Sequence, residues 1–496
     1  MNKFSLSFVF LLSLVLNHSV VDYSNGSLKS IMLASTTPND SDYSYNWSYS
    51  NMHAPEAWDI SLGSKHVSVA IIDTGVYSNH NDLNDNFDLN NNSFVYDYLN
   101  NNDPGLSDTL SSNDFVGHGT QVAGVIGAKG DNNIGIAGVC WTVDIVSLPY
   151  FDSIEMPQLS LIATAVNYAT QHNIPIINFS SISENQFNNL YAVESAIRNY
   201  PGLFVCCAGN VSSGGVDLDN DTSHNSYPSE WSGIQNLISV GALTPQNTIR
   251  TTSNYGEISV DLFAPGEDIY TTDISASGYS SVSGTSFAAP QVAGAAALLK
   301  SINPSLTTLQ LKTAILDNVD FVPALNGKCV TGGKLNVYEA AKSIIPTLNN
   351  SSSRVVEANN YNWEKITVGS PSTYSFTLTG NPGLELKLSP SVDSNTLPYQ
   401  TGSIENGQTS ITFTHLFPYA GTYYLRVYNP TSSDLSYVLS ETFVSYHTHA
   451  FTGPVTPIDN DYHGVLCSCG EIVNPMPHIV KPKNPHLCIV CGATVY

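Results

Sequence analysis

Three short sequences, far apart in the chain, each place one reactive side chain among glycines and other small residues. Asp73 lies in Val-Ala-Ile-Ile-Asp-Thr-Gly, His118 in Gly-His-Gly-Thr-Gln-Val-Ala-Gly and Ser286 in Gly-Thr-Ser-Phe-Ala-Ala-Pro. A serine hydroxyl attacks an amide only when a base accepts its proton and a third group orients that base. The three sequences supply one residue type for each role, in the order Asp, His, Ser. They therefore indicate cleavage of amide bonds through a covalent acyl intermediate.

The helices and strands expected around these residues would place the three side chains where each could perform its role in catalysis. Ser286 comes just before a helix that we expect to begin within residues 287–290, because Pro290 suits a first helical turn. The N–H of Ser286 could then help to hold an oxyanion. His118 begins another expected helix, and Asp73 ends an apolar strand from which it could orient the imidazole. Asp73 or His118 alone would more often be structural, but the three residues together indicate a catalytic site.

The part of the chain between residues 50 and 345 alternates strand-like and helix-like patterns. Apolar runs predict buried parallel strands at residues 67–72, 174–179, 203–207 and 237–240. Helices are predicted at 122–128 and 289–299, with a turn and a closing helix over 332–342. The helix at 289–299 is apolar on nearly all sides and therefore belongs in the interior. This alternation predicts an α/β fold in which helices cover both faces of a parallel sheet.

The pattern changes after Pro346. Residues 346–356 are polar and are predicted to form a linker. Over residues 357–446, short alternating runs separated by Gly and Pro predict a small antiparallel β-sandwich. This domain could bind substrate or a surface, or it could stabilise the chain, and the sequence leaves both roles open. Residues 447–496 form a Cys- and His-rich tail with little apolar content.

Four cysteines of the tail form two closely spaced pairs, each followed by glycine. They are Cys467, Cys469, Cys488 and Cys491. Such pairs suit tetrahedral Zn²⁺, and a structural zinc site would explain how so small a segment folds. Only one residue separates the first pair, where two are commoner. Two disulfides are the alternative in an oxidising compartment, and free thiols are the third.

The N-terminus has the pattern of a signal peptide over residues 1–22. Lys3 is followed by an apolar run over residues 4–16 and then by a polar stretch. The run is short for a transmembrane helix, although an uncleaved anchor is the alternative. We expect cleavage, export and a secreted, extracellular protein. Residues 23–44 then form a short pro-segment or linker before an α/β domain at 45–345.

Composition narrows the classes of partner. The chain has 496 residues, 42% of them hydrophobic, which is enough for more than one domain with a core of its own. Its formal net charge of -24 argues against nucleic acid as a partner, because phosphate binding needs clustered Lys and Arg. We expect protein or peptide substrates and a monomeric protein.

Residues 45–344 resemble the subtilisin-like serine peptidases, the subtilase family. The resemblance rests on the sequences around the three residues above and on Ala208-Gly-Asn210, which is similar to the family's oxyanion-hole segment. It implies a three-layer, parallel-sheet catalytic domain and a secreted serine endopeptidase that needs no cofactor for its chemistry. It also implies that the side-chain amide of Asn210 donates to the oxyanion. The alternatives are a turn role for Asn210 and a catalytically idle binding protein, against which the intact triad argues.

The resemblance also implies where substrate binds. The residues implied to contact substrate are Ser180, Ser181, Ile182, Cys207, Ala208 and Gly209. Family members usually have glycine where this chain has Ile182, so this side chain is expected to narrow or reshape the main specificity pocket. Gln121 stands where histidine is common in the family, and we expect only a local effect.

A calcium site is a further implication of the resemblance. Asp82 is similar to a family calcium ligand, and residues 130–136 are similar to the ligand loop after the catalytic histidine. The implied ligands are Asp82, Asn132, Ile134 and Ile136. Carboxylate, amide and backbone oxygens suit a hard cation, while an ordinary turn is the alternative. Segment 23–44 is also shorter than the folding propeptide of many subtilases, so the chain is expected to fold unaided or with a helper in trans.

Overall fold

The structure is a computed structural model that describes residues 36–87, 114, 116–150, 157, 159–182 and 190–446 apart from 213, 222, 232, 277 and 393–397. In the terminal regions it describes the backbone of short strands alone, β1 (Val20–Ser24), β2 (Ser27–Ile31), β21 (Val455–Pro457), β22 (Tyr462–Leu466), β23 (Ile472–Pro477), β24 (Val480–Lys481) and β25 (Asn484–Cys488). The side chains of the predicted signal peptide and of the predicted zinc ligands therefore lie outside the described part of the chain. The chain divides into two compact units. The first comprises Met1–Ile345 and Val392–Thr396, and the second comprises Pro346–Ser391 and Leu397–Tyr496.

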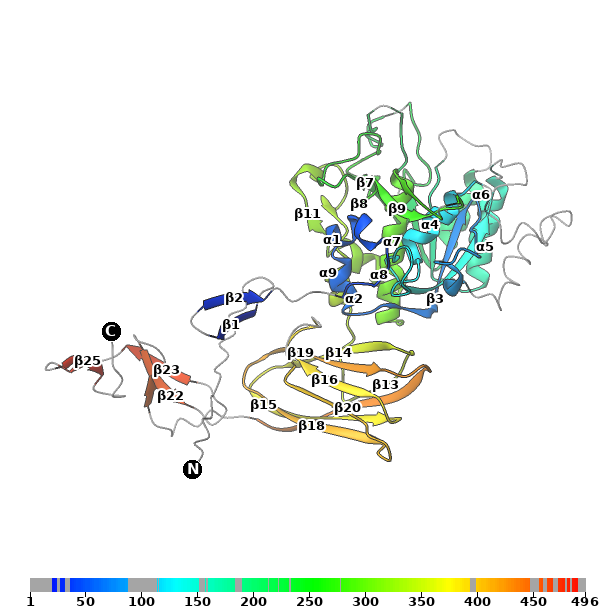
Figure 1. Ribbon diagram of the computed structural model, residues 1–496. Coiled ribbons are helices and arrows are strands. Elements are labelled where there is room, and N and C mark those ends of the chain that lie inside the picture. Colours follow the sequence, from blue (N-terminus) through cyan, green and yellow to red (C-terminus); the bar gives the residue numbers. More distant parts are fainter. Residues whose placement is uncertain are drawn as a thin grey trace. The chain divides into compact units, whose positions relative to one another are not determined.

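An eight-stranded sheet is the centre of the first unit (Figure 1). Its strand order is β11-β12-β8-β7-β6-β5-β3-β4, and neighbouring strands are parallel except β11 and β12. The strands are β3 (Gly63–Asp73), β4 (Thr142–Pro149), β5 (Ile176–Phe179), β6 (Leu203–Cys207), β7 (Leu237–Leu243), β8 (Leu262–Pro265), β11 (Asp320–Phe321) and β12 (Gly333–Lys334). Apolar runs form the central strands because both faces of a parallel sheet are buried.

Helices cover both faces of this sheet. On one face, α5 (Leu159–Gln171) and α6 (Leu190–Asn199) share a hydrophobic cluster with buried side chains of β3 and β5. On the other face, α7 (Thr285–Ile302) contacts β3 and β5 to β8 and packs against α4 (His118–Gly127). The smaller elements are α1 (Ser48–Asn51), α2 (Ala54–Trp58), α8 (Thr308–Leu316), α9 (Val337–Ser343), the hairpin of β9 (Ile269–Thr272) and β10 (Tyr279–Val282), and the 3₁₀ turns Tyr43–Tyr45, Asn84–Asn86 and Pro323–Leu325. This arrangement confirms the predicted three-layer α/β fold.

Helix α7 begins earlier than the sequence predicts. It starts at Thr285, so Ser286 lies in its first turn and Pro290 lies inside the helix. Proline has no N–H to donate to the carbonyl four residues earlier, which here is the carbonyl of Ser286. The hydroxyl of Ser180 donates to this carbonyl instead, at 2.7 Å, and so replaces the missing helical bond.

Two four-stranded antiparallel sheets, β13-β20-β15-β18 and β14-β19-β16-β17, form the second unit and confirm the predicted β-sandwich. The strands are β13 (Ser351–Val356), β14 (Asn360–Val368), β15 (Ser372–Gly380), β16 (Glu385–Ser389), β17 (Gln400–Ser403), β18 (Ser410–Phe417), β19 (Gly421–Asn429) and β20 (Leu435–Tyr446). Their buried side chains, among them Phe376, Leu386 and Leu425, share one hydrophobic cluster. Residues 351–356 are predicted to belong to a linker but form strand β13. They are a strand because they pair with β20 along their whole length.

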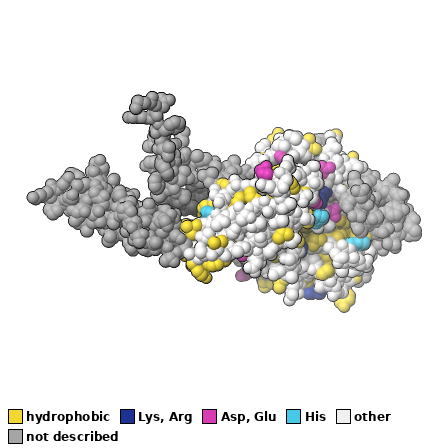
Figure 2. Space-filling model, turned by 90° about the horizontal axis from the view of Figure 1, so that it is seen from below, with side chains coloured by type: hydrophobic (Ala, Val, Ile, Leu, Met, Phe, Trp, Pro, Cys, Tyr) yellow, Lys and Arg dark blue, Asp and Glu magenta, His cyan; other side chains and the backbone are white. Residues whose placement is uncertain are grey.

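Part of the segment predicted as a pro-segment or linker bonds to the loop at 130–136 within the first unit. The Asn39 side chain accepts the N–H of Asn133 at 2.8 Å, and the Ser41 hydroxyl accepts the N–H of Gly135 at 3.1 Å. Within the described residues, no helix is both long enough and apolar enough to cross a membrane. On the face drawn in Figure 2, the Lys and Arg side chains are few and scattered, in keeping with the low content of basic residues.

Candidate active site

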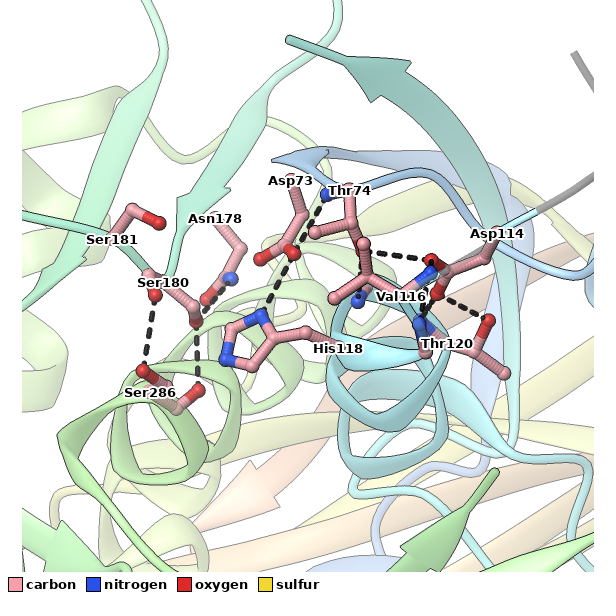
Figure 3. Close-up of polar contacts among 12 residues, drawn as sticks. Asp73, Thr74, Asp114, Val116, His118, Thr120, Asn178, Ser180, Ser181 and Ser286 are labelled. Atoms are coloured by element: carbon pink, nitrogen blue, oxygen red, sulfur yellow. Dashed lines mark hydrogen bonds and ion pairs between the residues drawn. The ribbon is translucent and has the colours of Figure 1, made fainter. Parts of the chain in front are cut away.

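Asp73 and His118 meet where the end of a strand faces the start of a helix (Figure 3). Asp73 is the last residue of β3 and is 1% exposed, and His118 is the first residue of α4. Nδ1 of His118 lies 2.7 Å from Oδ1 of Asp73 and donates to it. The same oxygen accepts the N–H of Thr74 at 2.8 Å. The carboxylate therefore fixes which nitrogen of the neutral imidazole carries the proton.

The glycines on either side of His118 allow this close approach. Gly117 has a φ of 95°, a left-handed conformation that L side chains rarely adopt. A Cβ on Gly119 would lie 1.9 Å from the carbonyl oxygen of Gly75. A larger residue in place of Gly119 would therefore push α4 away from β3 and separate His118 from Asp73.

Opposing effects set the charge state of His118. Burial disfavours the imidazolium, but the charge and hydrogen bond of Asp73, with a smaller contribution from Asp114, outweigh this effect and raise the pKa of His118 above its usual value. The His118 side chain is 27% exposed, so a ligand in the pocket can reach it. The surroundings thus favour the cation that forms when His118 accepts a proton.

Ser286 faces the second ring nitrogen of His118 (Figure 3). Its hydroxyl donates to the main-chain carbonyl of Ser180 at 3.0 Å, while the Ser180 hydroxyl donates to the Ser286 carbonyl. Attack on a substrate requires the Ser286 hydroxyl to direct its proton at His118 instead of at the Ser180 carbonyl. The two reciprocal bonds also fasten α7 to the segment at 180–182.

Asn210 is held against the N-terminus of α7. Its Oδ1 accepts the N–H of Thr285 at 3.1 Å, and its Nδ2 donates to Oγ1 of Thr285 at 2.9 Å. A side-chain amide carries two N–H donors, so the bond to Thr285 leaves the second donor for a ligand. The N–H of Ser286, in the first turn of α7, has no intrahelical acceptor. Two donors are thus available beside the serine hydroxyl.

These side chains line a single pocket of about 400 Å³. It is lined by Asp73, Thr74, Val116, His118, Ser180, Ser181, Ile182, Cys207, Asn210 and Ser286. The structure thus unites the predicted triad, the predicted oxyanion donor and most of the residues predicted to contact substrate. Among the described residues, Ala208 and Gly209 are not part of this lining, since Ala208 is fully buried and the N–H of Gly209 bonds to α7. Sequence reasoning misses Thr74 and Val116, whose only signal is their closeness in the chain to Asp73 and His118.

Ile182 lines the pocket and lies close to Gly209. A Cβ on Gly209 would lie 2.9 Å from Cδ1 of Ile182, so the isoleucine lies against the Gly209 backbone. Cys207 also lines the pocket, and burial raises the pKa of its thiol to about 12. Cys207 is therefore a neutral wall residue and not a reactive thiolate.

Comparison with known proteins agrees with this geometry. A profile described as the subtilase family matches residues 64–343. The chain belongs to the subtilase family. It is 32% identical to a thermophilic serine proteinase of Bacillus sp. (strain AK1), over 65% of this chain and 73% of that protein. It is also 32% identical to thermitase of Thermoactinomyces vulgaris, over 62% of this chain and 99% of thermitase.

A solved structure extends the likeness to the fold. A protease from Pseudoalteromonas arctica matches this subtilase with a TM-score of 0.51 and 26% sequence identity, covering 62% of this chain and 100% of the other. These relatives confirm the resemblance inferred from the motifs. The subtilase is a serine endopeptidase.

The predicted calcium ligand Asp82 is buried beside the loop at 130–136 of this subtilase. Its Oδ1 accepts the side-chain amide of Asn132 at 2.7 Å, and its Oδ2 accepts the N–H of Ile136 at 2.9 Å and the hydroxyl of Tyr279 at 3.2 Å. Burial, with a contribution from the charge of Asp40, raises the pKa of Asp82 to about 7.

Asp40 is a second carboxylate at this loop, which the sequence reasoning missed. Its Oδ2 accepts the N–H of Asp131 at 2.7 Å, whereas its Oδ1 is buried with no hydrogen-bond partner among the described residues. Burial raises the pKa of Asp40 to about 6. Two buried carboxylates and one oxygen without a donor fit a hard cation. Such an ion would neutralise the buried negative charge and would bind the oxygen that lacks a hydrogen bond. In the described part of the chain no three His, Cys, Asp or Glu side chains form a metal cluster, so such an ion would need amide and backbone oxygens as well.

Proposed function

We propose that this subtilase is a secreted enzyme that cleaves proteins and peptides through Asp73, His118 and Ser286 by way of an acyl-enzyme. The observation that carries the proposal is the 2.7 Å hydrogen bond between His118 and Asp73, beside Ser286 in one pocket. Ser286 is the nucleophile, His118 the general base and acid, and Asp73 the carboxylate that orients His118.

Each half of the reaction moves one proton through His118. Oγ of Ser286 attacks the substrate carbonyl carbon while Nε2 of His118 takes the hydroxyl proton. Asp73 stays ionised and stabilises the imidazolium, which then gives its proton to the leaving amine as the C–N bond breaks. In the second half, His118 takes a proton from water, the water oxygen attacks the acyl carbon, and the proton returns to Ser286 as the acid product leaves.

Asn210 and the backbone of Ser286 supply the donors for the oxyanion. Asn210 and Ser286 both line the pocket, and the second N–H of the Asn210 amide and the N–H of Ser286 would donate to the oxygen on which negative charge develops. Donors that are already oriented need not reorganise during the reaction, and this makes them effective. The chemistry needs no cofactor.

Secretion and choice of partner are supported by the sequence. The signal-peptide pattern over residues 1–22 supports export to the extracellular space. The net charge of -24 supports protein and peptide substrates over nucleic acid. We assign the β-sandwich to binding of substrate or of a surface. We also propose that the enzyme acts as a monomer.

Two structural ions complete the proposal. Calcium would be held by Asp40, Asp82 and Asn132 with backbone oxygens of Ile134 and Ile136, and it would neutralise the two buried carboxylates. Support comes from the orphaned Oδ1 of Asp40. Zinc would be held by Cys467, Cys469, Cys488 and Cys491, for which the support is the spacing of the cysteines.

Labelling with a fluorophosphonate probe tests the proposed nucleophile. The probe reacts covalently with a serine that a neighbouring base activates, so we expect stoichiometric labelling of the wild-type protein. Ser286→Ala should abolish labelling, and His118→Ala should slow it strongly. Ser281→Ala, which removes an exposed serine of β10, is the matched control and should label like the wild type. A folded wild-type protein that takes no label would contradict the proposed enzymatic function and favour a catalytically idle binding protein.

A further inference from the structure

The helix that carries His118 begins without a side-chain cap of its own. The N-cap residue of α4 is Gly117, which has no side chain to accept the free N–H groups of the first turn. Asp114 takes this role from three residues upstream and is 6% exposed. Its Oδ1 accepts the N–H of Val116 at 3.2 Å and of Gly117 at 2.8 Å, and its Oδ2 accepts the N–H and the hydroxyl of Thr120 at 2.9 and 2.8 Å.

Asp114 also connects α4 to the strand that carries Asp73 (Figure 3). Oγ1 of Thr74 donates to Oδ1 of Asp114 at 2.9 Å and accepts the N–H of Gly119 at 2.9 Å. Thr74 directly follows Asp73 and donates its own N–H to the Asp73 carboxylate. One buried carboxylate and one hydroxyl thus fasten the end of β3 to the start of α4, at the level where His118 meets Asp73.

The charge of Asp114 acts on the same helix end. The N-terminus of a helix carries a partial positive charge, which disfavours an imidazolium at its first position. A carboxylate that accepts the N–H groups of this turn offsets that charge. Among the described residues, the charged groups that act on His118 are Asp73 on β3 and Asp114, and α7 presents the neutral Ser286 and the ring of Phe287, 5.5 Å from the imidazole.

We propose that Asp114 is a positioning residue for the reaction, which holds the His118 helix against Thr74 and supports the imidazolium through its negative charge. The inference rests on the proposed role of His118 as the base. It adds a second carboxylate beside Asp73, which acts through His118 and does not touch substrate.

Asp114→Asn is the direct test, with kcat and KM measured on a peptide substrate per mole of probe-labelled serine. This normalisation removes any misfolded fraction from the result. Asparagine keeps the size of the side chain but loses the charge and one acceptor, so kcat should fall about tenfold, the loss expected for one charge-assisted bond, with KM nearly unchanged. The acid limb of the kcat/KM profile should move to lower pH by about 0.2–0.7 unit, because His118 loses a neighbouring negative charge and deprotonates more easily. Asp114→Glu, which restores the charge, should bring the acid limb back toward its wild-type position.

A matched control separates positioning from a merely structural cap. Asp219 likewise accepts two backbone N–H groups, of Ile258 and Ser259, and the Ser259 hydroxyl, but does not line the pocket. Asp219→Asn should lower the melting temperature without moving the acid limb. Thr74→Val, which removes the link but keeps the charge, should lower kcat with the acid limb in place, and it serves as the test if Asp114→Asn does not fold.

The outcomes are distinct. An unmoved acid limb and a wild-type kcat in labelled Asp114→Asn, or a wild-type kcat in Thr74→Val, would overturn the role of Asp114 while leaving the triad intact. A wild-type protein without label or activity would instead contradict the proposed function itself.

Discussion

At the scale of single residues, we expect Ile182 to limit which substrate side chains enter the pocket. The isoleucine lies against the backbone of Gly209 and lines the pocket together with Cys207. A carbonyl held between Ser286 and Asn210 belongs to the residue before the cleaved bond. We expect the side chain of that residue to enter the space that Ile182 partly fills. The geometry therefore favours small side chains at that position of the substrate.

Ile182→Gly should widen the preference of the enzyme. Removing the side chain opens room for a larger apolar group, so kcat/KM for a peptide with Phe before the cleaved bond should rise about tenfold or more relative to one with Ala. Ile182→Val, a smaller change at the same place, should give a smaller shift. The measurement is a cleavage profile on a peptide library, and an unchanged Phe-to-Ala ratio in Ile182→Gly would show that Ile182 does not limit the pocket.

At the scale of elements, the N-terminal segment and the loop at 130–136 depend on each other. Asn39, Asp40 and Ser41 each accept a backbone N–H of the loop. Thr36 makes a further contact with the carboxylate of Asp59. The segment is thus bonded to the loop, and the charge of Asp40 contributes to the raised pKa of Asp82.

If the proposed calcium ion is bound at this loop, its removal should loosen this part of the enzyme. With excess EGTA, the melting temperature of the full chain should fall by several degrees, because Asp40 and Asp82 would lose the ion that neutralises them. Asp40→Asn should reduce the difference between the calcium and EGTA samples. The control Asp219→Asn should keep the whole difference. Equal melting temperatures of the wild type with and without calcium would rule the site out.

At the scale of the whole molecule, the catalytic pocket and the β-sandwich belong to different units. Every residue that lines the pocket lies between Asp73 and Ser286, in the first unit. The solved protease from Pseudoalteromonas arctica is covered over its full length by 62% of this chain. The second unit has its own hydrophobic core between two sheets. Catalysis on a short peptide should therefore not require the sandwich.

A chain truncated after Ile345 keeps every residue that lines the pocket and so tests this separation. When it is truncated after Ile345, the protein should take the fluorophosphonate label and cleave a short peptide with kcat/KM within about twofold of the full chain, since no transition-state contact is removed. Cleavage of large or surface-bound proteins should fall if the sandwich binds them. A folded, labelled truncation with a strongly reduced kcat/KM on the short peptide would contradict the separation.

Much of this architecture can be predicted from local patterns. Strand β6 is a continuous apolar run, and helix α7 is composed mostly of small and apolar residues, because both are largely buried, and such patterns are visible without any partner. The predicted start of α7 is wrong because it places Pro290 in the first turn. The proline lies inside the helix, where the Ser180 hydroxyl compensates for its missing N–H. The bond comes from a segment more than a hundred residues away in the sequence.

The sequence by itself determined the reaction type, because Asp73, His118 and Ser286 each lie in a motif whose glycines and small residues are needed locally for the turn and the close approach. Tertiary structure alone decided which residues support them. Asp114 and Thr74 cap and fasten the His118 helix, Asp40 bonds to the loop at 130–136, and Ile182 lines the pocket. A carboxylate or an isoleucine acquires such a role only from the groups that folding brings against it, and their spacing in the sequence carries no trace of that contact.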